Sequence, residues 1–298
     1  MPTVDLSQLP QPEVIEALDF EVILSEWKDL IIAAFPPEQQ ASVSAAMALE
    51  SEPLNIIAQA GTYREVILRQ RINDGAAACM LSHSVSTDLD NLVANNNTQR
   101  LEITPGTENS PAVMESDTAL RLRAQAAFEG LSVAGPTGAY EYFAMSASGK
   151  VADARAISPS PAVVVVSVLS TEGDGTADAA LLETVDRALS AEDKRPVADR
   201  LTVQAAEIVN YQIDAVLYLY PGPESEPIYI AAQNSLQLWL SQQGKIGRDV
   251  ACSAVIAALH IQGVQRVELL SPAENIVIDD TQAARCTGFT VTLGGTDE

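Results

Sequence analysis

The sequence has 298 residues, of which 40 are acidic and 17 are basic, so its formal net charge is −23 at pH 7. A surface with this excess of negative charge repels nucleic acid and anionic lipid at long range, which disfavours direct binding to DNA. The opening segment MPTVDLSQLP lacks the basic start and apolar core of a signal peptide, and no run approaches the roughly 18 apolar residues that cross a bilayer. A chain of this length is expected to form two or three subdomains with a large buried core.

The cysteines and the basic residues indicate a reduced compartment and protein partners. Cys79, Cys252 and Cys286 form no close pair and no metal-ligand spacing, and their odd number favours reduced thiols in a cytosolic compartment. Four of the 17 basic residues are lysines, which leaves 13 arginines. Arginine suits the planar ion pairs of protein interfaces, although an arginine-rich composition can also follow genome composition.

The first hundred residues are expected to form a helical region. An extended lead-in over residues 6–12 precedes a helix that is predicted from the apolar spacing of residues 14–27 and ends before the prolines at 36–37. A longer helical segment over residues 54–80 has apolar residues on more than one face. Such a helix has to be buried by more than one neighbour, so part of its surface is expected to meet another chain. A small self-contained helical domain is the alternative.

A segment rich in turn residues separates this region from the rest of the chain. It contains Pro105, Gly106 and Pro111 and has no hydrophobic periodicity, which is typical of a linker or a long surface loop. The predicted division is a helical N-terminal region at 1–100, a linker at 101–116, a central α+β domain at 117–223 and a C-terminal α+β domain at 224–298.

The central domain is predicted to open with a helix, a glycine-rich turn and a second helix that runs to about Ser148. Asp117 is placed to cap the first helix. The apolar side chains of that helix are expected to be buried, namely Leu120, Leu122, Ala124, Ala127 and Phe128. Its polar side chains are expected to be exposed, namely Arg121, Arg123 and Gln125. The turn is marked by Gly130, Gly135, Pro136 and Gly138.

Two glycine-rich segments imitate ion-binding loops without meeting their requirements. The spacing from Gly130 to Gly135 imitates a phosphate-binding loop, but Pro136 stands where lysine is required and no strand precedes the loop. Asp174 beside two glycines hints at a calcium loop, but the alternating ligands and the closing glutamate are out of place. We interpret the first segment as a helix–turn–helix connection and the second as the cap of the following helix.

The remaining elements predict an α+β fold with one or two small subdomains and mostly antiparallel sheets. Residues 163–169 include five valines and no charge, which is typical of a strand covered on both faces. The further predicted elements are a helix containing Leu181 to Leu189, adjacent strands at 199–207 and 212–220, helices at 228–240 and up to His260, and strands at 264–270 and 287–293. This order favours an α+β plan over a doubly wound sheet.

Residues that could carry chemistry are sparse. His83 and His260 are the only histidines, and most of the chain separates them, so a histidine-based triad or zinc site is disfavoured. The sequence contains no nucleophile-elbow pattern and no dinucleotide-binding fingerprint after a strand. We therefore predict no catalytic residue, no metal ligand and no cofactor-binding residue.

Several long strings resemble one known family. In chain order they are VDLSQLP, TYREVILRQRIN, FEGLSVAGPTGAYEYFA, VADARAISPSPA, VLYLYPGPE and QAARCTGFTVT. They resemble the baseplate J-like family, in particular its members from peduovirus-type contractile-tailed phages. The resemblance extends over nearly the whole chain, and residues 104–113 are its least constrained part.

The resemblance implies a structural subunit of the baseplate wedge in a contractile phage tail or a phage-derived tail. Such a subunit is needed for baseplate and tail assembly and for transmitting the contraction signal, without enzymatic activity and without a cofactor. The implied partners are a second copy within the wedge, neighbouring wedges in a sixfold ring, and the wedge proteins called I and W, close to the central spike and hub. The implied location is the virion, after assembly in the cytoplasm of the bacterial host. The alternative is a cytosolic α+β enzyme or adaptor unrelated to phage tails.

Two surfaces are predicted under this resemblance. The ring contacts are expected on residues 221–298. The contact with wedge partners is expected on the long N-terminal helix, at Leu54, Ile57, Tyr63, Ile67, Leu68 and Ile72.

Overall fold

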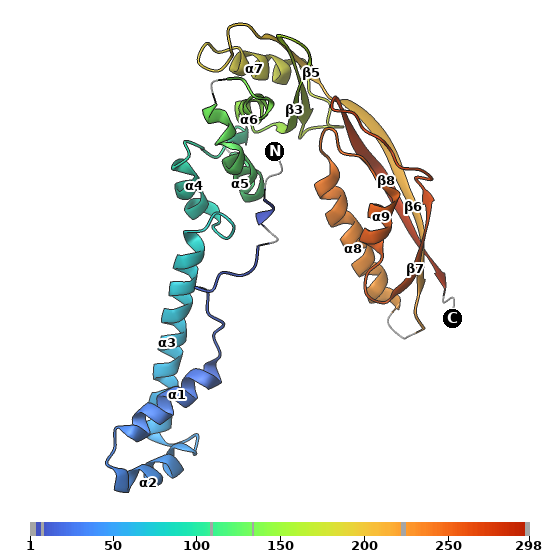
Figure 1. The fold of residues 1–298 in the computed structure, drawn as a ribbon. Helices are drawn as coiled ribbons and strands as arrows, with labels where there is room; N and C mark the ends of the chain where they lie inside the picture. Colours follow the sequence, from blue (N-terminus) through green and yellow to red (C-terminus); the bar gives the residue numbers. More distant parts are fainter. Residues whose placement is uncertain (1–3, 7–8, 108–109, 133, 222–224, 296–298) are drawn as a thin grey trace. The chain divides into compact units, whose positions relative to one another are not determined.

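The computed structural model describes residues 4–6, 9–107, 110–132, 134–221 and 225–295 (Figure 1). Residues 7–8 of the predicted lead-in, and 222–224 after the strand predicted to end at Tyr220, lie outside the described residues. The chain divides into two compact units, Pro2–Asn97 and Thr98–Glu298. The first unit is helical and the second contains small mixed sheets with helices, so the predicted α+β class is confirmed.

The helical unit is organised around one long helix. Its helices are α1 (Phe20–Ala33), α2 (Pro37–Met47), α3 (Pro53–Ala78) and α4 (Ser86–Ala94). The first helix begins later than predicted, because Asp19 is its N-cap and its carboxylate accepts hydrogen bonds from the backbone N–H groups of Glu21 and Val22. A small core of Leu24, Met47 and Ala58 joins α1, α2 and α3.

The segment predicted as a linker contains a short antiparallel pair of strands, β1 (Glu102–Thr104) and β2 (Val113–Met114). Helix α5 (Asp117–Ala126) follows, and its cap is Ser116 rather than Asp117, since the Ser116 hydroxyl accepts from the Ala119 N–H. The expectation that Arg123 is exposed was wrong. Its guanidinium is buried in an ion pair with Glu115.

The same helix departs from its predicted burial at two apolar positions. Leu122 and Phe128 are exposed, whereas Leu120, Ala124 and Ala127 are buried as predicted. The reason is that the apolar residues span too wide an arc for one contact, and the buried ion pair occupies part of the inner side.

The central sheet has the order β3-β4-β5. Its elements, with the helices around them, are the short 3-10 helix η2 (Glu129–Leu131), α6 (Thr137–Ala147), β3 (Val151–Ser160), β4 (Val163–Ser170), α7 (Ala179–Leu189) and β5 (Arg200–Ala205). Strand β4 is antiparallel to β3 and parallel to β5. The core between this sheet and helices α6 and α7 includes Val166, Val168 and Val185, which are fully buried. The prediction of a covered valine strand is therefore confirmed.

The C-terminal sheet has the order β7-β6-β8. Its elements, with their helices, are β6 (Glu207–Leu219), α8 (Ser225–Gln243), α9 (Cys252–Leu259), β7 (Val264–Ser271) and β8 (Gln282–Gly295). Strand β6 is antiparallel to β7 and parallel to β8. Helices α8 and α9 cover one face of the sheet around a core that includes Leu217 and Leu236 (Figure 1).

The prediction that the strands at 199–207 and 212–220 pair with each other was wrong. Strand β5 pairs with β4, whereas β6 is the central strand of the next sheet. Only Ala206 separates β5 from β6, and one residue cannot form the reversal that a hairpin requires. The C-terminal sheet therefore begins at Glu207, inside the segment that was predicted to belong to the central domain.

Candidate interaction surface on the helical unit

Helix α3 buries polar and small side chains and exposes apolar ones. The side chains of Asn55, Ala58, Thr62 and Asn73 are buried. At 100° per residue they lie on one side of the helix, the side on which the α1 core residues and the segment before α1 pack. Asn73 donates from Nδ2 to the Glu16 carbonyl at 2.9 Å and accepts at Oδ1 from the Glu16 N–H at 3.1 Å. Polar contacts thus fill much of the inner side of α3.

A second group of polar contacts holds α1 against α3. Trp27 donates from Nε1 to Glu65 at 2.5 Å, and Arg69 pairs with both Glu65 and Glu16. The hydrogen bond from Trp27, followed by the one from Arg69, lowers the pKa of Glu65. Gly61 lies under the indole ring, since a Cβ atom there would be 2.9 Å from the ring carbons of Trp27. A glycine is therefore needed for α1 to approach α3 this closely.

The predicted contact residues lie on the outer surface of α3, with one exception. Ile57, Tyr63, Ile67, Leu68 and Ile72 are between 43 and 61% exposed. The exception is Leu54, which packs against the core of Leu24, Met47 and Ala58.

Ile56 extends this surface and was missing from the predicted set. It is 53% exposed, and its spacing to Tyr63 and Ile67 places the three side chains on one line along α3. The signal for it was available in the sequence, because residues 7 and 11 positions apart recur on the same side of a helix. We call the set of Ile56, Ile57, Tyr63, Ile67, Leu68 and Ile72 the α3 apolar surface.

Two arginines lie within the α3 apolar surface. Arg64 and Arg71 are exposed and seven residues apart, so they point in nearly the same direction. In the part of the chain that the structure describes, neither forms an ion pair. A complementary surface for α3 would therefore be apolar with acidic groups at its border.

The glycine-rich turn of the central domain is built by close packing. A Cβ atom at Gly130 would clash with the Tyr142 ring. Gly135 has a φ of +70° and lies against Pro196, and Pro136 is the N-cap of α6. Gly138 lies under the carboxylate of Glu129. Each of these positions is occupied by packing within the chain, so we describe the turn as structural.

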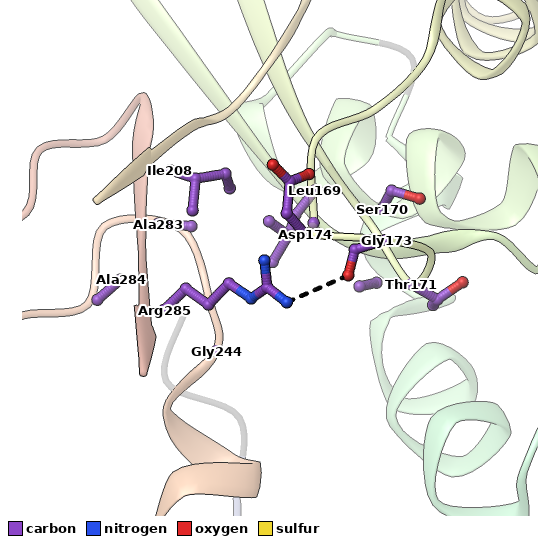
Figure 2. Close-up of a pocket in the computed structure, with 12 residues that line it drawn as sticks. Leu169, Ser170, Thr171, Gly173, Asp174, Ile208, Gly244, Ala283, Ala284 and Arg285 are labelled. Carbon is purple, nitrogen blue, oxygen red and sulfur yellow. Dashed lines mark hydrogen bonds between the residues drawn. The ribbon is translucent and has the colours of Figure 1, made fainter. Parts of the chain in front are cut away.

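A pocket of about 220 Å³ lies where the central and C-terminal sheets meet. Figure 2 shows Arg285 pointing toward the turn after β4, where it donates to the Gly173 carbonyl at 3.4 Å. The other polar groups of the pocket also have partners within the chain. The Thr171 hydroxyl donates to the Lys150 carbonyl, and Asp174 accepts from the Thr176 N–H, which lowers the pKa of Asp174. This pocket offers no converging set of unengaged groups for a substrate.

The two sequence segments that imitated ion-binding loops have local roles. The helix after the acidic turn is capped by Asp178, whose carboxylate accepts from the Leu181 N–H, and not by Asp174. Among the described residues, no group of three or more histidine, cysteine, aspartate or glutamate side chains is arranged to hold a metal ion. None of the described helices combines the length and hydropathy needed to cross a membrane.

Comparisons with known proteins assign family relationships along the chain. Three family models match in order: the Baseplate J-like N-terminal domain at residues 50–107, the Baseplate J-like central domain at 132–205, and the Baseplate J-like protein C-terminal domain at 211–292. The second match ends with β5, at residue 205, and the third begins within β6, at residue 211. The chain is also 55% identical to baseplate protein J of Escherichia phage P2 over 302 aligned positions, which cover 100% of both chains.

Proposed function

The chain belongs to the baseplate J-like family, and from this premise we propose that it is a subunit of the baseplate wedge in a contractile tail. Its role in a phage baseplate is structural. The observation that carries this conclusion is the 55% identity to a phage baseplate protein over the full length of both chains. The finer assignment to the wedge, and to the transmission of the contraction signal, is our proposal.

The α3 apolar surface supports a role in a larger assembly. Full burial of an exposed aliphatic side chain is worth about 1.5–3 kcal/mol, and these side chains are about half exposed, so each could still contribute roughly 1 kcal/mol to association. Because the inner side of α3 is already packed against its own unit, the outer side is available to another chain. We propose that this surface binds wedge partners through Ile57, Tyr63, Ile67, Leu68 and Ile72.

The proposed partners are a second copy of this chain within the wedge and the wedge proteins I and W. Neighbouring wedges would join through residues 221–298 into a sixfold ring near the central spike and hub. Assembly would take place in the cytoplasm of the host. A ring that changes width on attachment needs interfaces with two packings of similar free energy, which favours moderate contacts over one large apolar interface.

The gene-deletion experiment tests the proposed function. We expect a phage or prophage that lacks this gene to produce no intact tails, and the wild-type gene supplied in trans to restore them. Negative-stain microscopy of the lysate gives the count of tails. Contractile tails of normal number and appearance in the absence of the gene would overturn the proposal.

A matched pair of substitutions tests the α3 apolar surface. Leu68 on α3 and Leu49 in the turn after α2 are 60 and 61% exposed, so Leu68→Asp and Leu49→Asp make the same chemical change at the same exposure. We expect L68D to reduce the yield of tails by about tenfold or more and L49D to leave it nearly unchanged, because only the first places a charge in a proposed contact. Equal tail yields for the two variants, with both chains folded by circular dichroism, would contradict the assignment.

A further inference from the structure

The outer edge of strand β8 is the least protected sheet edge among the described residues. Strand β8 lies at the border of its sheet, because the order is β7-β6-β8, and no described strand pairs with its other side. Gly247 covers only its beginning, by donating to the Gln282 carbonyl. A β-bulge follows at residues 286–288, where the register with β6 shifts by one residue. Beyond the bulge, the edge continues from Gly288 to Gly295.

The other edges of the two larger sheets carry features that oppose pairing. Strand β5 has six residues. Strand β3 contains Pro159, and the backbone N–H of Ala156 is taken by the Glu141 carboxylate at 3.2 Å. Strand β7 carries Arg266 and Glu268, and Pro272 follows its end. Short length, proline and charge are the usual protections of an edge strand, and each of these three strands has at least one.

Residues 288–295 of β8 have the opposite composition. Their sequence GFTVTLGG contains no charge and no proline, and its phenylalanine, valine and threonines favour extended structure. The Tyr229 hydroxyl donates to the Val291 carbonyl at 2.9 Å, but a carbonyl oxygen has a second lone pair for a backbone donor. An edge of this kind is a template for the addition of a strand from another chain.

We propose that the outer edge of β8 pairs antiparallel with β8 of a second copy of this chain, so that two C-terminal sheets join across a twofold axis. The proposal rests on the proposed function and names both the partner and the strand of the C-terminal ring contact. The occupant is a second copy because the strand is complementary to itself. With Thr290 opposite Thr290, Phe289 lies opposite Val291, and aromatic residues pair favourably with β-branched ones across strands.

Charge and symmetry favour this occupant as well. Two copies that each carry a net charge of −23 repel one another, but the residues that pair around Thr290, from Gly288 to Thr292, carry no charge, and salt screens the remaining charges beyond about 10 Å. A twofold contact uses the same edge on both copies, so it closes with two strands and leaves no free edge for further addition. Because both free edges are used in the contact, the unprotected strand does not add further copies and the protein does not form fibres.

Cross-linking in assembled tails tests the pairing directly. The three native cysteines are replaced by serine, and single cysteines are placed at Thr290→Cys, at Thr292→Cys and, as a control, at Thr202→Cys on the edge strand β5. All three threonines are exposed. Purified tails are treated with a bismaleimide that spans about 14 Å, the separation of residue 292 in the two copies when each lies opposite Gly288, and denaturing gels show whether two copies are linked. We expect linked pairs for T290C and T292C and none for T202C. Tails that contain T290C and T292C but yield no linked pair would overturn the proposal.

A charge-swap experiment covers the case in which the cysteine variants fail to enter tails. Thr290→Lys with Thr292→Lys, and Thr290→Glu with Thr292→Glu, place like charges directly opposite each other at residue 290 and two residues away, at 292, on the same face of the proposed pair. We expect each double variant alone to lower tail yield by roughly tenfold or more, and co-expression of the two to restore it. Normal tails from either double variant alone would overturn the β8 pairing and leave the proposed function intact. Normal tails in the complete absence of the gene would instead overturn the proposed function.

Discussion

Leu217 in β6 and Ile57 in α3 are aliphatic residues of similar size with opposite surroundings. Leu217 is fully buried in the core formed by β6 and helices α8 and α9, whereas 61% of Ile57 is exposed. The difference extends to the two units as wholes. The α+β unit buries its apolar residues within its own chain, while α3 buries asparagine and threonine and exposes isoleucine and leucine. An apolar pattern in the first unit thus marks an exposed surface, and in the second it marks a core.

The largest expected effect on stability lies in the α+β unit, at the buried ion pair between Arg123 and Glu115. The two side chains are 6 and 7% exposed, and Arg123 also donates to the Gln99 carbonyl. Arg123→Met leaves the Glu115 carboxylate buried without its partner, so we expect a loss of about 3–5 kcal/mol in the free energy of unfolding. Urea unfolding followed by circular dichroism measures it.

A double substitution separates the free energy contributed by the ion pair from the cost of leaving one buried charge unpaired. Arg123→Met combined with Glu115→Leu removes both charges, so we expect the double variant to be more stable than R123M alone. A double variant that is less stable than R123M would show that the other hydrogen bonds of Glu115, such as the one from the Leu101 N–H, outweigh the unpaired charge.

The second prediction compares the two aliphatic residues themselves. We expect Leu217→Ala to lower the free energy of unfolding by about 2–5 kcal/mol, because it removes buried methyl groups and leaves a cavity. Ile57→Ala is expected to change it by less than about 0.5 kcal/mol in the isolated chain, because its side chain is exposed.

The two tryptophans allow each unit to be followed separately in urea. Trp27 lies in α1 and Trp239 lies in α8, so single-tryptophan variants report the unfolding of one unit each. A large loss of stability in I57A, measured with Trp27, would mean that the α3 apolar surface is covered within its own chain.

Sequence periodicity located both kinds of surface and could not tell them apart. The uncharged valines of β4 predicted a covered strand, and the structure has one. The apolar residues of α3 were also recognised, but the pattern could not show that Leu54 is part of the core while Ile57 is exposed. That distinction depends on where α1 packs, and the packing is set by contacts such as Trp27 over Gly61 that join distant parts of the sequence.

Arg123 was mispredicted for a related reason. A helical pattern assigns polar residues to the outer side, and it does not register a carboxylate eight positions earlier that lies outside the helix. The same limit applies to β5 and β6. Both strands were recognised, but their partners are β4 in one case and β7 and β8 in the other, and strand pairing is not encoded in the alternation of a single strand.

The third prediction concerns a buried carboxylate in the α+β unit. Asp153 in β3 accepts from the Ile246 N–H at 2.9 Å, which ties the central sheet to the loop after α8. Burial raises the pKa of Asp153, and the hydrogen bond from Ile246 opposes the rise. A carboxyl whose pKa is higher in the folded state binds its proton more tightly when folded. Its charged form therefore lowers stability at pH values above its ordinary pKa of about 3.9.

Asp153→Asn removes this charge and keeps an acceptor for the Ile246 N–H. We expect the stability of D153N relative to wild type to increase as the pH is raised from about 4 to 7, through the elevated pKa of Asp153. Asp153→Ala removes the acceptor as well, so we expect it to lose about 1–2 kcal/mol relative to D153N at every pH. Urea unfolding across this pH range is the measurement, and a pH-independent difference between D153N and wild type would contradict the account.

The smallest expected effects come from two ion pairs with the same spacing, one in each unit. Glu183 and Arg187 in α7 are four residues apart, lie 2.8 Å from each other and are about three-quarters exposed, so Arg187→Ala is expected to cost about 0.3–0.5 kcal/mol. Glu65 and Arg69 in α3 have the same spacing, but Arg69 also pairs with Glu16, and Glu65 also accepts from Trp27.

Arg69→Ala is therefore expected to cost more than Arg187→Ala, because it disturbs contacts that join three segments of the helical unit rather than one helix. Thermal unfolding of both variants at low and high salt measures the difference, and the exposed α7 pair should lose most of its contribution in high salt. Equal costs for the two substitutions would mean that the polar side of α3 contributes little to holding α1. In that case the apolar contacts of Leu24, Met47 and Ala58 would be the main support for the position of α3.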